Sequence, residues 1–250
     1  MSVNPQSTIL KVENLTKYFG GLAALKDVSF EVPERHIYGF IGPNGAGKTT
    51  LFSTIAGAFP PSSGRVVSRG QDITGTKAHA LVKAGIARTH QVVRPFRAMT
   101  VLENVQVGLY FGRKKVSAHA ARDMAMEVLQ RVGLEQYANR KASTLSLGEQ
   151  KKLELARALA TDPDLLLCDE ICGGLSQTET RSMLALLQTI RDQGKTIMYV
   201  EHDVKAIMSV CDRVMVLNYG QKLAEGKPHE IQQDEAVIEA YLGHRARRVA

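Results

Sequence analysis

Three glycines, one lysine and two threonines lie close together between two apolar stretches, residues 36–41 and 51–55. A loop so poor in bulky side chains cannot pack a core, but its backbone N–H groups can surround an anion. The spacing Gly42-x-x-x-x-Gly47-Lys48-Thr49 is that of a phosphate-binding loop, in which Lys48 would reach the β- and γ-phosphate oxygens and Thr49 would hold magnesium. We therefore expect a nucleotide to be bound by Gly42, Pro43, Asn44, Gly45, Ala46, Gly47, Lys48, Thr49 and Thr50.

The alternative interpretation of this loop is a glycine-rich turn before an ordinary helix. Its neighbours in the sequence argue against that alternative, because an apolar run typical of a strand precedes it and a helix is expected to follow. The N-terminus of such a helix would add its own amides and its positive dipole end to the phosphate site. Nucleotide binding is therefore favoured, but the loop alone does not identify the reaction.

Two adjacent carboxylates, Asp169 and Glu170, follow a second apolar run at residues 165–168. The carboxyl ends of strands are where α/β sheets place their ligands. Asp169 would hold magnesium, directly or through water, and Glu170 would accept a proton from the water that attacks the γ-phosphate. Solvated acids at a strand end are the alternative, and the phosphate loop upstream favours the catalytic pair.

These residues need elements that hold them in place, and the apolar pattern predicts such elements. Residues 8–15 and 28–32 are typical of strands, with a turn at Gly20-Gly21 between them, so the N-terminal part is expected to be β-rich. Short apolar runs recur at residues 196–200 and 213–217, separated by helical stretches. This alternation predicts an α/β fold with a mostly parallel, buried core sheet.

A helical region is expected to interrupt this fold. Residues 117–132 carry apolar side chains at helical spacing, and residues 103–111 are expected to form a shorter helix before them. We expect one domain, residues 1–250, with an inserted helical subdomain at 92–160. Residues 1–91 and 161–225 would form the core with its antiparallel β region, and 226–250 a C-terminal helical tail.

A third motif, Leu145-Ser146-Leu147-Gly148-Glu149, leads into an amphipathic stretch. By itself it predicts a helix that is capped by Ser146 and has Glu149 in its first turn. It also resembles the signature sequence of ATP-binding cassette (ABC) ATPases, although Leu147 and Glu149 replace the usual glycine and glutamine. The resemblance implies a P-loop NTPase of the ABC ATPase fold that uses ATP and Mg²⁺. It further implies that Ser146 and Gly148 bind the γ-phosphate of ATP held by the opposite subunit.

Other motifs of this family follow in order, so that the resemblance covers nearly the whole chain. It implies that Phe19 stacks on adenine, with Tyr18 as a rival. It implies that Gln91 contacts magnesium and the attacking water, and that His202 touches the γ-phosphate.

Two positions depart from the family pattern near the loop that crosses to the other subunit, Gly173-Gly174-Leu175-Ser176. Ser176 stands where an aspartate is usual, and Ile171 replaces the proline that usually follows the catalytic glutamate. Both changes affect the loop expected at the dimer interface.

The task of the ATPase is indicated by two further stretches, residues 92–105 and 224–243. Both resemble the ATP-binding proteins of branched-chain amino-acid importers, and the second also resembles the ATPase of lipopolysaccharide export. The resemblance implies a transport motor for branched-chain or related amino acids or small organic acids, with lipopolysaccharide export or a non-transport ABC ATPase as alternatives. It also implies integral-membrane permease subunits, a second identical or related ATPase chain and, indirectly, a periplasmic substrate-binding protein as partners. Residues 94–99 are expected to line the permease groove.

Composition agrees with a globular, peripheral subunit at the cytoplasmic face of the inner membrane. The chain has 250 residues, of which 44% are hydrophobic, and its apolar runs are shorter than the roughly 18 residues that span a bilayer. Its start lacks a signal segment. Cys168, Cys172 and Cys211 have no paired spacing, so neither disulfides nor zinc are expected. The net charge of +7 is scattered and lacks an aromatic stacking pattern, so no nucleic-acid partner is expected.

Overall fold

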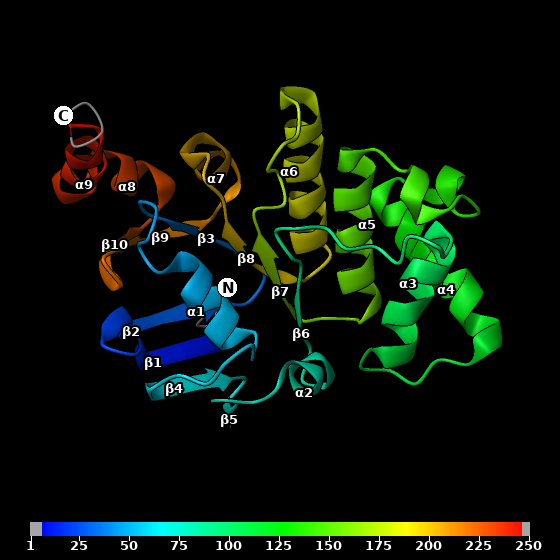
Figure 1. The fold of residues 1–250 in the computed structure, drawn as a ribbon, viewed down its shortest axis with the longest axis horizontal. Coiled ribbons are helices and arrows are strands. Elements are labelled where there is room, and N and C mark those ends of the chain that lie inside the picture. Colours follow the sequence, from blue (N-terminus) through cyan, green and yellow to red (C-terminus); the bar gives the residue numbers. More distant parts are fainter. Residues whose placement is uncertain (1–6, 247–250) are drawn as a thin grey trace, which may run out of the picture.

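The computed structural model describes residues 7–246, which form two sheets and the helices around them (Figure 1). One sheet is antiparallel and has the order β2-β1-β4-β5. Its strands are β1 Thr8–Phe19, β2 Leu22–Pro33, β4 Ser63–Ser68 and β5 Gln71–Asp72. The predicted β-rich start and the Gly20-Gly21 turn are confirmed, and both strands are longer than predicted. They continue to the turn because Phe19 pairs with Leu22, although the apolar alternation has ended by then.

The second sheet has six strands in the order β10-β9-β3-β8-β7-β6. The strands are β3 Ile37–Ile41, β6 Ile86–Arg88, β7 Leu165–Asp169, β8 Thr196–Val200, β9 Arg213–Asn218 and β10 Gln221–Gly226. Only the edge strand β10 runs antiparallel to its neighbour within the described sheet. The predicted mostly parallel core sheet is thereby confirmed.

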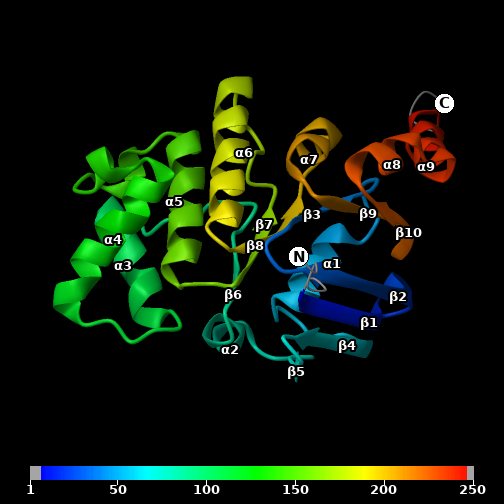
Figure 2. The same ribbon diagram turned by 180° about the vertical axis from the view of Figure 1, so that it is seen from behind.

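Alternate residues of the central strand β3 face opposite layers, as the two-residue period of a strand requires. Tyr38 and Phe40 belong to a core shared with α1 and the antiparallel sheet. Ile37 and Ile41 belong to a second core on the other face, where helices α6, α7, α8 and α9 pack (Figure 2). Helix α1, on the first face, spans Lys48–Ile55. The helices on the other face are α6 Gln177–Asp192, α7 Val204–Val210, α8 Pro228–Gln233 and α9 Glu235–Ala246.

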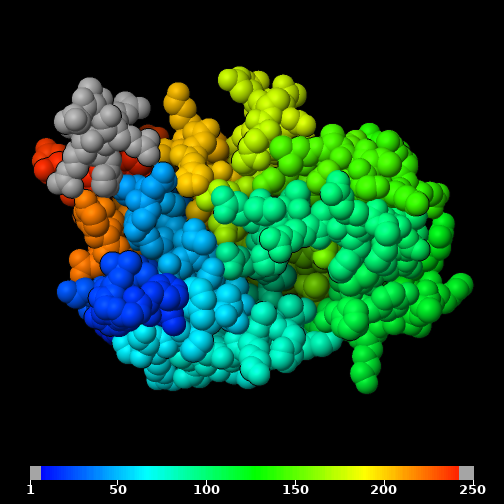
Figure 3. All heavy atoms as spheres, viewed as in Figure 1, coloured from blue at the N-terminus to red at the C-terminus, as the bar shows by residue number. Residues whose placement is uncertain are grey.

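Between β6 and β7 the chain forms helices that pack around a core of their own. They are α3 Val101–Phe111, α4 Ala118–Val132 and α5 Leu147–Ala160, with short 3-10 turns at Glu135–Tyr137 and Ala142–Thr144 between α4 and α5. A short α2, Ala78–Lys83, lies before β6. In the space-filling view the three helices make a broad lobe at one end of the molecule (Figure 3). The division of the chain at residues 91/92 and 160/161 stays a prediction.

Capping residues explain where these helices begin. The predicted helix at residues 117–132 starts after Ser117, whose hydroxyl accepts the N–H of Ala120. Helix α3 starts two residues before Glu103, because Thr100 and Glu103 form a capping box. Within residues 7–246 no helix is long and apolar enough to cross a bilayer.

Candidate functional site

The loop between β3 and α1 has a backbone that only glycine permits at two positions. A Cβ on Gly42, with φ +152°, would lie 2.1 Å from the carbonyl oxygen of Leu217. A Cβ on Gly47, with φ +99°, would lie 2.6 Å from the carbonyl oxygen of Ala24. Gly47 also caps α1 in a left-handed conformation. The loop is therefore held closely between β2 and β9.

Lys48, the first residue of α1, points back into this loop. Its Nζ donates to the carbonyl oxygens of Gly42 (2.6 Å) and Pro43 (3.0 Å), and the residue is only 6% exposed. Burial lowers the pKa of Lys48, and the nearby charges of Glu170 and Asp169 oppose this shift. The ammonium group thus lies between the loop and the two carboxylates.

A pocket of about 500 Å³ opens over the loop. It is lined by Leu22, Ala23, Ala24, Asn44, Gly45, Ala46, Gly47, Lys48, Thr49, Thr50, Glu170, His202 and Tyr219. The structure therefore brings most of the predicted phosphate loop together with two predicted catalytic residues. Gly42, Pro43, Phe19, Gln91 and Asp169 are not among the lining residues.

The Glu170 carboxylate contacts both of the other predicted catalytic residues. Its Oε1 lies 2.8 Å from His202 Nε2, and its Oε2 accepts a hydrogen bond from Gln91 Nε2. Glu170 is buried and has a left-handed backbone, φ +50°, which is strained for a non-glycine residue. Gln91, although outside the pocket lining, is joined to the site through this carboxylate.

Asp169 lies beside this cluster and is almost completely buried. Its Oδ2 accepts a hydrogen bond from Arg88 Nη2 at 2.6 Å, while its Oδ1 has no hydrogen-bond partner among the described residues. Arg88 also donates to Ser53 Oγ of α1 at 3.0 Å. Sequence reasoning missed Arg88, the last residue of β6, because its carboxylate partner lies on another strand.

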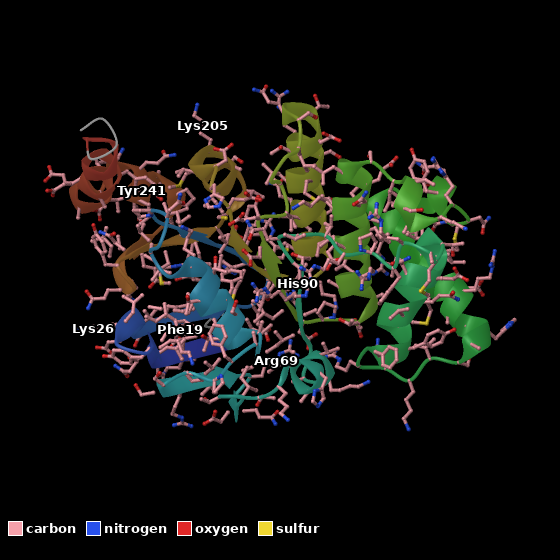
Figure 4. The ribbon with its side chains drawn as sticks, in the orientation of Figure 1. Phe19, Lys26, Arg69, His90, Lys205 and Tyr241 are labelled. Carbon is pink, nitrogen blue, oxygen red and sulfur yellow. The ribbon has the colours of Figure 1, made fainter. Side chains whose placement is uncertain are left out.

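The structure does not place Phe19 in the pocket wall. Its ring packs edge-to-face on Phe59, with centroids 5.3 Å apart, and Lys17 Nζ lies 5.2 Å from its centroid. Figure 4 shows Phe19 on the antiparallel sheet, where it ends β1. The nearby wall is formed instead by residues 22–24, which belong to no recognisable motif in the sequence.

Ser146 and Gly148 lie away from the phosphate loop, in a second pocket of about 250 Å³. Ser146 caps α5 in a capping box with Glu149, as predicted. Gly148 lies inside the first turn of α5 rather than before the helix, and a Cβ there would come within 2.5 Å of Glu179 Oε1. Within one chain the two predicted halves of the site are therefore separate.

A phosphate loop that leads into a helix, with a carboxylate pair at the end of a parallel strand, defines a P-loop ATPase of the α/β class. Residues 25–173 match the ABC transporter family, and the chain belongs to it. Residues 221–247 match a second family, described as branched-chain amino acid ATP-binding cassette transporter. The expected family, fold class and ATPase activity are thereby confirmed.

Known relatives cover almost the full chain. The high-affinity branched-chain amino acid transport ATP-binding protein LivG of Salmonella typhimurium is 41% identical, over 94% of this chain and 98% of that protein. The lipopolysaccharide export system ATP-binding protein LptB of Escherichia coli K12 is 34% identical, over 94% of this chain and 97% of that protein. A crystal structure of an ATP-binding cassette of an ABC transporter in its ADP conformation superposes with a TM-score of 0.87 at 32% identity. The match covers 95% of this chain and 99% of that one.

Proposed function

We propose that the chain is the ATP-hydrolysing motor of a membrane importer for branched-chain amino acids or related small amino or organic acids. It would work as a peripheral subunit at the cytoplasmic face of the inner membrane. The observation that carries this proposal is the pocket in which Glu170 and His202 face the phosphate loop. Higher identity to LivG than to LptB, together with the match at residues 221–247, favours import over lipopolysaccharide export.

Each residue of the pocket has a task in this proposal. The loop amides and Lys48 bind the phosphates, with Lys48 exchanging its two backbone carbonyls for β- and γ-phosphate oxygens. Glu170 takes the proton of the attacking water, and Gln91 and His202 orient that water and the γ-phosphate. Phe19 would have to turn away from Phe59 to stack on adenine.

The residues present fit a magnesium ion. Asp169 Oδ1 is a buried oxygen without a hydrogen-bond partner among the described residues, and Thr49 and Gln91 would supply further oxygens. Such hard oxygen donors suit Mg²⁺, which often keeps several waters and few protein ligands. When bound, the ion would neutralise charge on the phosphates.

The proposed permease contact is the segment after Gln91. The Asn104 side chain makes two hydrogen bonds to the backbone of Phe96. Its Oδ1 accepts the Phe96 N–H at 2.8 Å, and its Nδ2 donates to the Phe96 carbonyl at 3.1 Å. The Arg157 guanidinium lies 4.7 Å from the Phe96 ring centroid. Val92 and Phe96 nevertheless remain 63% and 42% exposed, as expected of a segment that docks on another chain.

The ATPase part of the proposal is tested with purified protein. Lys48→Ala should weaken ATP binding and abolish hydrolysis, because it removes the ammonium that faces the phosphates. Glu170→Gln should slow hydrolysis by about 10²- to 10⁴-fold and leave ATP bound, because only the base is lost. Lys205→Met, at an exposed lysine of α7, is the matched control and should hydrolyse ATP like wild type (Figure 4). Wild-type turnover in folded Lys48→Ala or Glu170→Gln protein would contradict the proposal.

The transport part is tested in vesicles that contain the chain and its permease. Hydrolysis should rise when the substrate-binding protein is added with leucine, isoleucine or valine. Stimulation by lipopolysaccharide but not by amino acids would favour the export alternative.

A further inference from the structure

Lys151 of α5 is a buried lysine that the proposed mechanism does not use. It lies one turn after Ser146 and is only 5% exposed. Its Nζ donates to the carbonyl oxygen of Gln91 at 3.0 Å and to that of Glu170 at 2.9 Å. Among the ion pairs of the described chain, none includes Lys151. One side chain of the lobe formed by α3, α4 and α5 thus holds the backbone of two proposed site residues.

A buried lysine is costly unless its donors are satisfied, because its charge loses hydration. The neighbouring buried positions Leu153 and Leu155 show that apolar side chains fill this helix without that cost. The adjacent Lys152 is partly exposed, as is usual for lysine. What Lys151 gains in return is a pair of hydrogen bonds to two carbonyls that lie 79 positions apart in the sequence.

The two carbonyls belong to residues whose side chains are hydrogen-bonded to each other, Glu170 and Gln91. The Glu170 N–H donates to the Val200 carbonyl at 3.0 Å, and the Glu170 carbonyl accepts from Lys151, so the peptide groups on both sides of this strained residue are fixed. The same Nζ also holds the Gln91 carbonyl. It therefore sets the distance between the backbones of Gln91 and Glu170, whose side chains are hydrogen-bonded to each other.

We propose that Lys151 is a positioning residue of ATP hydrolysis: it aims the Glu170 carboxylate and the Gln91 amide by holding their carbonyls on α5. The inference rests on the proposed roles of Glu170 and Gln91. Because Ser146 begins the same helix, Lys151 also links the half of the site at the N-terminus of α5 to the catalytic carboxylate of its own chain.

The test is the replacement Lys151→Met, which keeps most of the length of the unbranched side chain and removes its donors. A misplacement of about 1 Å can cost about 10²-fold in rate, so kcat should fall by about that factor. The phosphate loop is untouched, so KM for ATP and the affinity for a fluorescent ATP analogue should stay within about two-fold of wild type. Lys151→Arg retains donors that can reach both carbonyls and should restore most of kcat, and Lys205→Met should match wild type.

A combination with Glu170→Gln shows whether Lys151 acts through the carboxylate. In that background Lys151→Met should change the residual rate by less than about three-fold, because groups that act as a unit are not additive. If Glu170→Gln itself hydrolyses ATP normally, the proposed function fails. If Glu170→Gln is inactive while folded Lys151→Met keeps wild-type kcat, or loses ATP affinity as much as kcat, the inference alone fails. Should Lys151→Met not fold, Lys151→Gln is measured with the same expected direction.

Discussion

At the scale of single residues, Glu201, between the end of β8 and His202, shows how a buried carboxyl supports the site. It is 5% exposed, and its Oε1 accepts the N–H of Cys172 in the loop after Glu170 at 2.6 Å. Burial raises the pKa of Glu201, and the backbone N–H groups of Cys172 and His202 oppose the rise. The negative charge of Glu170 adds to the rise, whereas Lys151 lowers the pKa. The folded protein therefore holds this proton more tightly than the unfolded chain does.

The sign of the resulting pH dependence follows from linkage. The contribution of Glu201 to stability is fully present below its ordinary pKa of 4.5 and is lost as the pH rises through the higher folded value. Glu201→Gln keeps an oxygen for the Cys172 N–H but carries no charge. Urea unfolding at pH 5 and pH 8 should therefore show a smaller loss of stability with rising pH in the variant than in wild type. An equal loss in both proteins would show that Glu201 does not contribute to the dependence.

At the scale of elements, two helices of the same lobe begin with the same device. Thr100 caps α3 with its hydroxyl accepting the Glu103 N–H at 3.2 Å, and Ser146 caps α5 by accepting the Glu149 N–H at 3.4 Å. Replacing either by alanine should lower the free energy of unfolding by about 1 kcal/mol, because one N-terminal N–H loses its partner.

Only Ser146 also belongs to the proposed nucleotide site. Ser146→Ala should therefore reduce ATP hydrolysis at least about ten-fold, whereas Thr100→Ala should leave it near wild type. Chemical unfolding and steady-state ATPase assays of both variants check this pair. Equal activity losses in both would mean that the Ser146 effect is one of stability alone.

At the scale of the whole molecule, the separation of the two pockets predicts that hydrolysis needs two chains. Lys48 and Glu170 line one pocket, and Ser146 and Gly148 line the other. In the Glu170→Gln variant, trapped ATP should hold two chains together, so light scattering after gel filtration should show monomer without ATP and dimer with it. Adding Lys48→Ala removes tight ATP binding and should restore the monomer. A Glu170→Gln protein that stays monomeric with saturating ATP and Mg²⁺ at every concentration would count against a shared site.

The sequence determined those features that depend on neighbouring residues. The phosphate loop could be predicted because its glycine and lysine spacing is local, and the structure shows why glycine is required at positions 42 and 47. The cap at Ser146 and the strands β7, β8 and β9 could be predicted for the same reason, because capping chemistry and apolar runs act within a few residues.

Tertiary structure alone decided the contacts between distant segments. The Arg88–Asp169 ion pair and the hold of Lys151 on Gln91 and Glu170 join residues on different elements, and no local pattern encodes them. The pocket wall at residues 22–24 and the packing of Phe19 on Phe59 likewise depend on how β1 and β2 pack against the phosphate loop and the segment after α1. The physical reason is that the residues around a position determine which helix or strand it belongs to and on which face of that element its side chain lies. Which partner that face meets is fixed only when the elements pack.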